Sequence, residues 1–353
     1  MHVNELTADL AQDLAQGEPL PRGSADNAAT AAIRVEYRTL EVNAKLPAGL
    51  LAAVRFGRDF VRHESASAES STLRVDVGLE PLMQPAQTEL WWANGTVEHG
   101  RLGMVRYARD DHHLFAVMNV DEREHGGIRA AAEAAYAEMR RFQQQSPFPH
   151  LLRIWNYLDA INEGAGDLER YRQFCVGRTR GLGDVRSENY PAATAIGCQH
   201  PTHQLQVYWL AGRTPGKPIE NPRQVSAYRY PRAHGPTSPT FARATLAADG
   251  TLLVSGTASI VGHVSQHGGD PLAQLEETLR NLAMLSEHAG NARTRTQPAN
   301  TLLKVYVRDQ AHLAEIAAEL RQRLPLSEAI FLAADVCRRE LLLEIECVQP
   351  AVG

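Results

Sequence analysis

The chain has 353 residues and a mass of 38.8 kDa, which predicts two domains or one large domain and excludes a single small module. Hydrophobic residues make up 44% and charged residues 22% of the sequence, ordinary values for a globular protein that exclude a disordered, collagen-like or coiled-coil chain. The 36 Lys and Arg residues face 41 Asp and Glu residues and form no basic run, so nucleic acid is not expected as a partner.

The cysteine pattern and the hydropathy of the chain both bear on its location. The four cysteines show no CxxC pair and no metal-ligand spacing, which indicates reduced thiols and no zinc site. No stretch reaches the roughly 18 apolar residues of a membrane span, and residues 1–30 contain no apolar segment of signal-peptide length. We therefore expect a cytoplasmic protein that does not enter a membrane.

The N-terminal third of the chain predicts a lead-in followed by short strands. Residues 1–31 are rich in Ala, Asp, Gln and Gly and have weak periodicity, which is typical of a flexible segment. Alternating apolar residues between Pro, Gly and charged turns then predict strands. These strands are expected at residues 33–40, 50–56, 73–77, 89–92 and 104–107.

An approximate internal repeat organises the rest of the sequence. In the first copy a strand at 114–121, the tripeptide His125-Gly126-Gly127, a helix at 128–144 and a strand at 151–159 follow one another. The second copy has a strand at 252–259, His267-Gly268-Gly269, a helix at about 271–288 and a strand at 302–309. Each copy continues with a helix and two strands. The repeat predicts an α+β fold of two tandem halves, each a mixed β-sheet with helices packed on one face.

The last predicted strand, over residues 341–348, carries two carboxylates on one side. Side chains alternate between the faces of a strand, so Glu344 and Glu346 share a face with Leu342 and Val348. From the spacing alone, either these glutamates mark the solvent face of a half-buried strand or one of them is a buried acid.

Several segments resemble known families. GPTSPTFARATLAADGTLLVSGTAS at 235–259, the KVYVRD strand at 304–309 and Glu-Ile-Glu at 344–346 look like the YjgF/RidA family. QVSAYRYPRAHGPTSP at 224–239, LLVSGTASIVGH at 252–263 and ADVCRRELLLEIE at 334–346, behind a degenerate YjgF-like first half, resemble the chorismatases. The resemblance implies a degenerate YjgF-like N-terminal domain at 32–212 and a YjgF/RidA-like catalytic domain at 213–353.

The chorismatase resemblance implies a cofactor-independent enzyme that cleaves chorismate into pyruvate and 3-hydroxybenzoate or 4-hydroxybenzoate. It places the general acid at Glu344, which falls on the position of the YjgF/RidA functional glutamate. Ser255, Gly256, Thr257 and Ala258 match the family's pocket wall, and Cys337 would line the ring pocket of a hydroxybenzoate-forming enzyme.

Chorismate carries two carboxylates, so its pocket requires cationic or hydrogen-bonding side chains. Arg308, on the second-half KVYVRD strand, and Arg153, on its first-half counterpart, are the candidates for the cations. Tyr208 and Tyr228 are candidates for phenolic hydrogen bonds, although packing in the core is the commoner role of a Tyr.

Two other functions stay open, a RidA-type deaminase of enamines and a non-catalytic protein that binds a small carboxylate. The YjgF/RidA proteins that carry a substrate-binding Arg have it where this chain has Ala329, which disfavours the deaminase. Asp110-Asp111-His112-His113 and His200-Pro201-Thr202-His203 are interpreted as turns rather than metal sites. No GxGxxG or Walker pattern predicts a nucleotide cofactor. A monomer and a homotrimer are both expected possibilities, because YjgF/RidA proteins are trimers and a tandem chain can imitate one of their interfaces.

Overall fold

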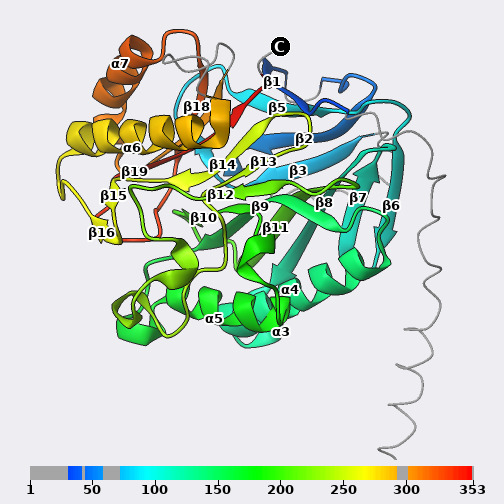
Figure 1. The fold of residues 1–353 in the computed structure, drawn as a ribbon, viewed down its shortest axis with the longest axis horizontal. Helices are drawn as coiled ribbons and strands as arrows, with labels where there is room; N and C mark the ends of the chain where they lie inside the picture. The colour runs from blue at the N-terminus through cyan, green and yellow to red at the C-terminus, as the bar shows by residue number, and fades with distance from the viewer. Residues whose placement is uncertain (1–30, 42–43, 59–71, 292–300, 352–353) are drawn as a thin grey trace, which may run out of the picture.

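The computed structural model describes residues 31–41, 44–58, 72–291 and 301–351. The lead-in expected over 1–31 lies outside the described residues apart from residue 31. In the described part, three large sheets surround a shared centre, and the longer helices lie outside them (Figure 1). No helix in these ranges is both long and apolar enough to cross a membrane.

The first half of the repeat is a six-stranded sheet with the order β10-β9-β11-β8-β7-β6. Strands β9 and β10 pair in parallel and every other neighbouring pair is antiparallel. The apolar face of α4, with Ile128, Ala135 and Met139 buried, packs on one side of the sheet next to α5. The elements are β6 (Glu98–Leu102), β7 (Val105–Arg109), β8 (His113–Asp121), α3 (Glu122–His125), α4 (Ile128–Gln145), β9 (His150–Asp159), α5 (Arg170–Leu182), β10 (Ala192–Cys198) and β11 (Gln204–Gly212).

The second half has the same topology, β18-β17-β19-β14-β13-β12, with the short β4 (Glu80–Pro81) added beyond β18. Here too the one parallel pair, β17 with β18, stands at the same place, and α6 and α7 cover the same face. The order of elements confirms the repeat and the α+β prediction. The elements are β12 (Lys217–Ile219), β13 (Ala244–Leu246), β14 (Leu252–Thr257), α6 (Pro271–Ser286), β17 (Leu302–Val307), α7 (Leu313–Arg323), β18 (Glu328–Ala333) and β19 (Leu343–Gln349).

The N-terminal strands form a third sheet of their own, with the order β1-β5-β2-β3. Its strands are β1 (Arg34–Thr39), β2 (Leu50–Phe56), β3 (Leu73–Val77) and β5 (Gln87–Trp92), close to four of the predicted ranges. Strands β2 and β3 pair in parallel, while β5 pairs antiparallel with both β2 and β1. This is the connectivity of β9, β10, β11 and β8, so the third sheet repeats four of the six strands of the first half without described helices between them.

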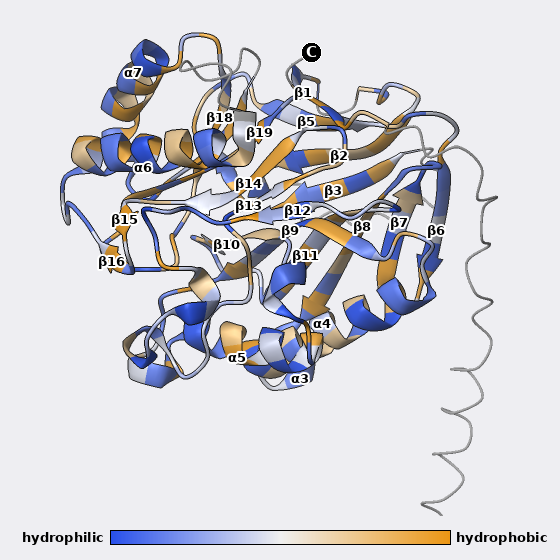
Figure 2. Ribbon diagram, viewed as in Figure 1, coloured by the Kyte–Doolittle hydropathy of each residue, from blue (hydrophilic) through white to orange (hydrophobic). Residues whose placement is uncertain are grey.

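The three sheets share one hydrophobic core on the faces turned away from the helices. It includes Trp91 of β5, Trp155 of β9 and Tyr306 of β17, all buried. Because side chains alternate along each strand, one set of residues packs under the helices and the other set meets at this centre. Figure 2 shows apolar residues along the strands of these sheets.

Candidate active site

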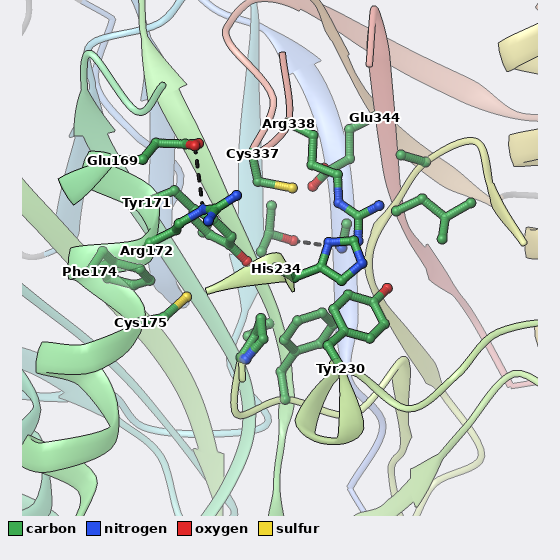
Figure 3. A pocket seen from close by; sticks show the side chains of 18 of the residues that line it. Glu169, Tyr171, Arg172, Phe174, Cys175, Tyr230, His234, Cys337, Arg338 and Glu344 are labelled. Carbon is green, nitrogen blue, oxygen red and sulfur yellow. Dashed lines mark hydrogen bonds and ion pairs between the residues drawn. The ribbon is translucent and has the colours of Figure 1, made fainter. Parts of the chain in front are cut away.

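A cavity of about 200 Å³ opens at the seam between the two halves. The first half contributes the start of α5 and the middle of β10. The second half contributes the segment before β13, the end of β14, the β18–β19 loop and β19. Figure 3 shows side chains from both halves turned toward this space. The lining includes Tyr171, Arg172, Cys175, Arg178, Thr194, Tyr230, His234, Arg243, Gly256, Ala258, Cys337, Arg338 and Glu344.

The seam is closed by hydrogen bonds between β10 and β14. The Ala193 backbone N–H donates to Ser255 Oγ at 2.8 Å, and Ser255 Oγ donates to the Ala242 carbonyl at 2.6 Å. The Gly256 N–H donates to Thr194 Oγ1 at 2.9 Å. Gly256 is free to do this because the pairing of β14 with β19 is irregular between Val254 and Thr257. The bulge thus turns a backbone N–H of the second half toward the first half.

Glu344, on β19, is the carboxyl group of the cavity wall that lies nearest to Gly256. It is only 5% exposed, and burial, followed by the negative charge of Glu346, raises its pKa from 4.5 to about 8. Among the described residues none donates a hydrogen bond to it. A carboxyl group in this environment holds its proton at neutral pH and can give it up to a bound molecule.

Glu346, two residues further along β19, has the opposite environment. Arg153 Nη2 lies 2.8 Å from Oε2, while Lys304 Nζ and Trp155 Nε1 each lie 2.7 Å from Oε1. Burial alone would raise its pKa, but Lys304 and then Arg153 outweigh burial and lower it. The structure therefore contains one neutral and one ionised carboxyl group on the same strand face.

Arginines surround the neutral acid. Arg243 donates to the Val225 carbonyl at 2.9 Å and to Tyr230 Oη at 2.7 Å, and Arg338 donates to the His263 carbonyl at 2.9 Å. Each of these two guanidinium groups keeps one nitrogen without a hydrogen-bond partner among the described residues, as does Arg178. Because Arg178, Arg243 and Arg338 all line the cavity, the positive charge of its wall suits an anionic ligand.

His234 and Cys337 are neutral groups of the wall. His234 bonds to His263, ring nitrogen to ring nitrogen at 3.0 Å, and burial followed by the charge of Arg338 lowers the pKa of His234 to about 4. Burial and then Glu344 raise the pKa of the Cys337 thiol, so it is neutral at pH 7. Figure 3 shows Cys337 and Glu344 directed toward the same space. Cys337 thus acts as an uncharged part of the wall.

Of the residues singled out in the sequence, Glu344, Gly256, Ala258 and Cys337 line the cavity together. Ser255 and Thr257 lie beside it: Ser255 joins the halves, and Thr257 Oγ1 donates to the Ser255 carbonyl at 2.9 Å. Tyr208 is buried in the shared core, with its hydroxyl 3.3 Å from that of Tyr157. These three side chains are structural and do not face the pocket.

The two arginines expected to bind carboxylates lie outside the cavity lining, as does Tyr228, whose ring packs on Tyr190. Arg308 pairs with Asp335 at 2.6 Å and donates to the carbonyls of Val336, Arg338 and Leu341, so it holds the β18–β19 loop in place. Arg153 is committed to Glu346 and Thr194. Both arginines form ion pairs with carboxylates of the protein, Asp335 and Glu346, and so do not line the pocket as the sequence analysis expected.

Sequence reasoning missed Tyr230, His234, Arg243 and Arg338. Three of the four lie inside segments that carry the chorismatase resemblance: Tyr230 and His234 in 224–239, and Arg338 in 334–346. Their position in those segments was the available signal. Arg243 lies in the YjgF-like segment 235–259, where nothing in its spacing distinguishes it from a surface arginine.

Both segments interpreted as turns lie where two strands are connected, β7 to β8 and β10 to β11. Asp110 Oδ1 accepts hydrogen bonds from the backbone N–H groups of His112 and His113, at 2.7 and 2.6 Å. Within the described ranges, no three or more His, Cys, Asp or Glu side chains are grouped so that they could hold a metal ion.

Comparison with known proteins identifies relatives that cover most of the chain. Residues 89–211 match the family model described as chorismatase FkbO/Hyg5-like, N-terminal. A 3-hydroxybenzoate synthase of Streptomyces hygroscopicus is 36% identical over 74% of this chain and 80% of its own, and a chorismatase of Streptomyces rapamycinicus is 39% identical over 81% and 89%. A crystal structure of a chorismatase superposes with a TM-score of 0.79 at 31% identity, covering 90% of this chain and 99% of the other. With this identity and coverage, the chain belongs to the chorismatase family.

Proposed function

We propose that the chain cleaves chorismate into pyruvate and a hydroxybenzoate, with Glu344 as the general acid. The observation that carries the proposal is one buried carboxyl group, with a pKa raised to about 8, on the wall of an arginine-lined pocket. The relatives support the substrate, because they are named chorismatase and 3-hydroxybenzoate synthase.

In the first step Glu344 donates its proton to the methylene carbon of the enolpyruvyl group. The methylene becomes a methyl group, and positive charge develops on the ether carbon, where the ether oxygen stabilises it. Glu344 is left as a carboxylate. A positioned acid of this kind contributes typically 100- to 10,000-fold to a rate, roughly the general range for acid catalysis.

In the second step the bond between the ether oxygen and the ring breaks, and its electron pair completes the keto group of pyruvate. The ring 4-hydroxyl attacks the carbon that is released and loses its proton, which restores the proton lost by Glu344. The epoxide-like product then opens and aromatises to 3-hydroxybenzoate. Atoms balance without water, an oxidant or a cofactor. Attack by water at the ether carbon would instead give a dihydroxycyclohexadiene acid.

Several residues support the aromatic branch and the binding of the dianion. The neutral thiol of Cys337 and the methyl group of Ala258 give the wall near Glu344 an uncharged surface that disfavours water. For the substrate carboxylates we propose Arg243 and Arg338, with Arg172 and Arg178 nearer the first half, in place of Arg308 and Arg153. The alternative product 4-hydroxybenzoate stays possible by the same acid step.

We also propose that the chain works as a monomer in the cytoplasm. Its three sheets already surround one core within a single chain, which supports a monomer over the homotrimer. All four cysteines are free thiols, which supports a reducing compartment. Light scattering of the purified protein measures the mass directly: a value near 38.8 kDa supports the monomer, and three times that value contradicts it.

The test of the function is incubation of the purified protein with chorismate while pyruvate and aromatic products are counted. Pyruvate and 3-hydroxybenzoate released in equal amounts at an enzymatic rate are expected. Ammonia release from an enamine without pyruvate release from chorismate would favour a deaminase. Binding of chorismate without turnover would favour a non-catalytic binding protein.

A further inference from the structure

Four charged side chains form a buried cluster behind the pocket wall, and all three sheets contribute to it. Glu89 comes from β5, Arg153 from β9, and Lys304 and Glu346 from β17 and β19. Lys304 Nζ lies 2.8 Å from Glu89 Oε2 and 2.7 Å from Glu346 Oε1, and Arg153 completes the cluster on Glu346. None of the four is more than 3% exposed. Two cations therefore balance two anions at the centre of the molecule.

The cluster is asymmetric with respect to Glu344. Glu346 shares the strand face of Glu344 and receives both cations and the Trp155 N–H, whereas Glu344 receives none of them. Glu89 lies on the other side of Lys304, on a different sheet. The negative charge of Glu346, two residues along the strand from Glu344, is thus held by cations that contact Glu346 and not Glu344.

We propose that Glu346 is a positioning residue that keeps Glu344 protonated, with its own charge fixed by Lys304 and Arg153. This inference rests on the proposed role of Glu344 as the general acid. The repulsion between two carboxylates that share a low-dielectric site favours the state in which only one of them is ionised. Here the cation contacts determine which one, because they stabilise the charge on Glu346 alone.

Other charged groups also face Glu344, and their effects differ in sign. Arg153, from β9, and Arg243, from the segment before β13, favour its ionised form, but by less than burial and Glu346 oppose it. The titratable neighbours Tyr171, of α5, and Cys337, of the β18–β19 loop, have raised pKa values and are neutral. His234 is neutral as well. The other charged residues that line the cavity are Glu169, Arg172 and Arg178 around α5, and Arg338, Arg339 and Glu340 in the β18–β19 loop.

The experiment compares two double variants that each remove one cation and one anion from the same cluster. Lys304→Gln with Glu346→Gln removes the carboxylate beside Glu344. Lys304→Gln with Glu89→Gln is the matched control, because it leaves Glu346 paired with Arg153. The measurement is kcat for pyruvate release against pH, with circular dichroism of each variant as the check on folding.

Wild-type kcat is expected to fall as pH rises through about 8, because the acid loses its proton there. In the Glu346 double variant the inflection should move down by about one pH unit or more, and in the Glu89 double variant it should stay close to that of the wild type. If the Glu346 double variant does not fold, Arg153→Gln with Glu346→Gln removes the same carboxylate together with its other cation, and a downward move is again expected.

An unmoved inflection in the Glu346 variants, or an equal move in the Glu89 control, overturns the inference. Its failure is distinguishable from failure of the proposed function. If Glu344→Gln abolishes pyruvate release but the pH of the kcat inflection is unchanged in the Glu346 variants, only the positioning role of Glu346 is wrong. If Glu344→Gln is fully active, the proposed acid itself is wrong.

Discussion

Glu344 occupies the space that a side chain on residue 256 would need: a Cβ atom built on Gly256 would overlap Glu344 Oε1. The two residues belong to neighbouring strands, β19 and β14, and meet where the pairing of those strands is irregular. The same Gly256 donates its N–H to Thr194 of the other half. One glycine therefore fixes both the place of the acid and the seam beside it, because only a residue without a side chain permits this approach.

The first prediction follows from that contact. Gly256→Val should displace the Glu344 carboxyl group and lower kcat by about 100-fold, the order of loss that a shift of about 1 Å can cause at a reacting group. Gly268→Val is the control, because a Cβ at residue 268 meets no atom within 4 Å. Steady-state kinetics of both variants decide the point, and equal kcat values would show that the contact has no catalytic consequence.

A second prediction concerns stability against pH. The pKa of Glu344 is about 8 in the folded state and 4.5 ordinarily, so the proton is bound more tightly in the folded protein. The stabilisation that this proton gives is complete below pH 4.5 and is lost as pH rises to 8, with a total on the order of a few kcal/mol. Glu344→Gln has no such proton to lose. Its Tm relative to the wild type should therefore rise between pH 5 and pH 8, and a constant difference would contradict the raised pKa.

A third prediction separates the arginines that line the pocket from those that do not. Arg338→Gln should raise KM for chorismate, by about 30-fold or more if an unpaired carboxylate costs about 2 kcal/mol or more. Arg308→Gln should mainly lower the free energy of unfolding, because Arg308 pairs with Asp335 and supports the β18–β19 loop. Kinetics and denaturant unfolding of both variants test this. If Arg308→Gln raised KM more than Arg338→Gln, the substrate carboxylate would be bound by Arg308, as the sequence predicts.

A fourth prediction concerns the product. Cys337→Ala enlarges the cavity beside Glu344 and should admit water, so the share of dihydroxycyclohexadiene acid among the products should rise. Total pyruvate release should change much less than this share. Cys175→Ala is a matched control, because Cys175 is another thiol of the same pocket but lies on α5. Chromatography of the products with pyruvate counted in parallel is the measurement. An unchanged product ratio would make Cys337 an ordinary packing residue.

The sequence was sufficient to predict the repeat, whereas the role of Glu344 as the acid stays a prediction. Helix periodicity and strand alternation predict the helices and strands of both halves, because these depend on local patterns of apolar residues. The separate N-terminal sheet could not be predicted, since strand pairing between residues such as Val54 and Glu89 depends on contacts distant in the chain. The proposed domain limits at 32–212 and 213–353 stay a prediction, because the three sheets share their core.

Charged residues were the harder part of the site. Arg153 and Lys304 stand at matching positions of β9 and β17, yet both contact Glu346. Whether a strand arginine meets a substrate or a buried carboxylate depends on the partner that folding brings to it, and alternation along one strand carries no information on that partner. The same alternation correctly put Glu344 and Glu346 on one face but could not separate their protonation states.

The role of Glu344 is tested by pyruvate release from chorismate by Glu344→Gln beside Glu344→Asp and the wild type, at pH 7 and saturating substrate. Glutamine keeps the shape and removes the proton, so kcat should fall by about 100-fold or more, while the aspartate variant should retain part of the activity. Substrate binding measured by calorimetry should persist in the Gln variant. A Glu344→Gln enzyme with wild-type kcat would contradict the assignment of Glu344 as the acid.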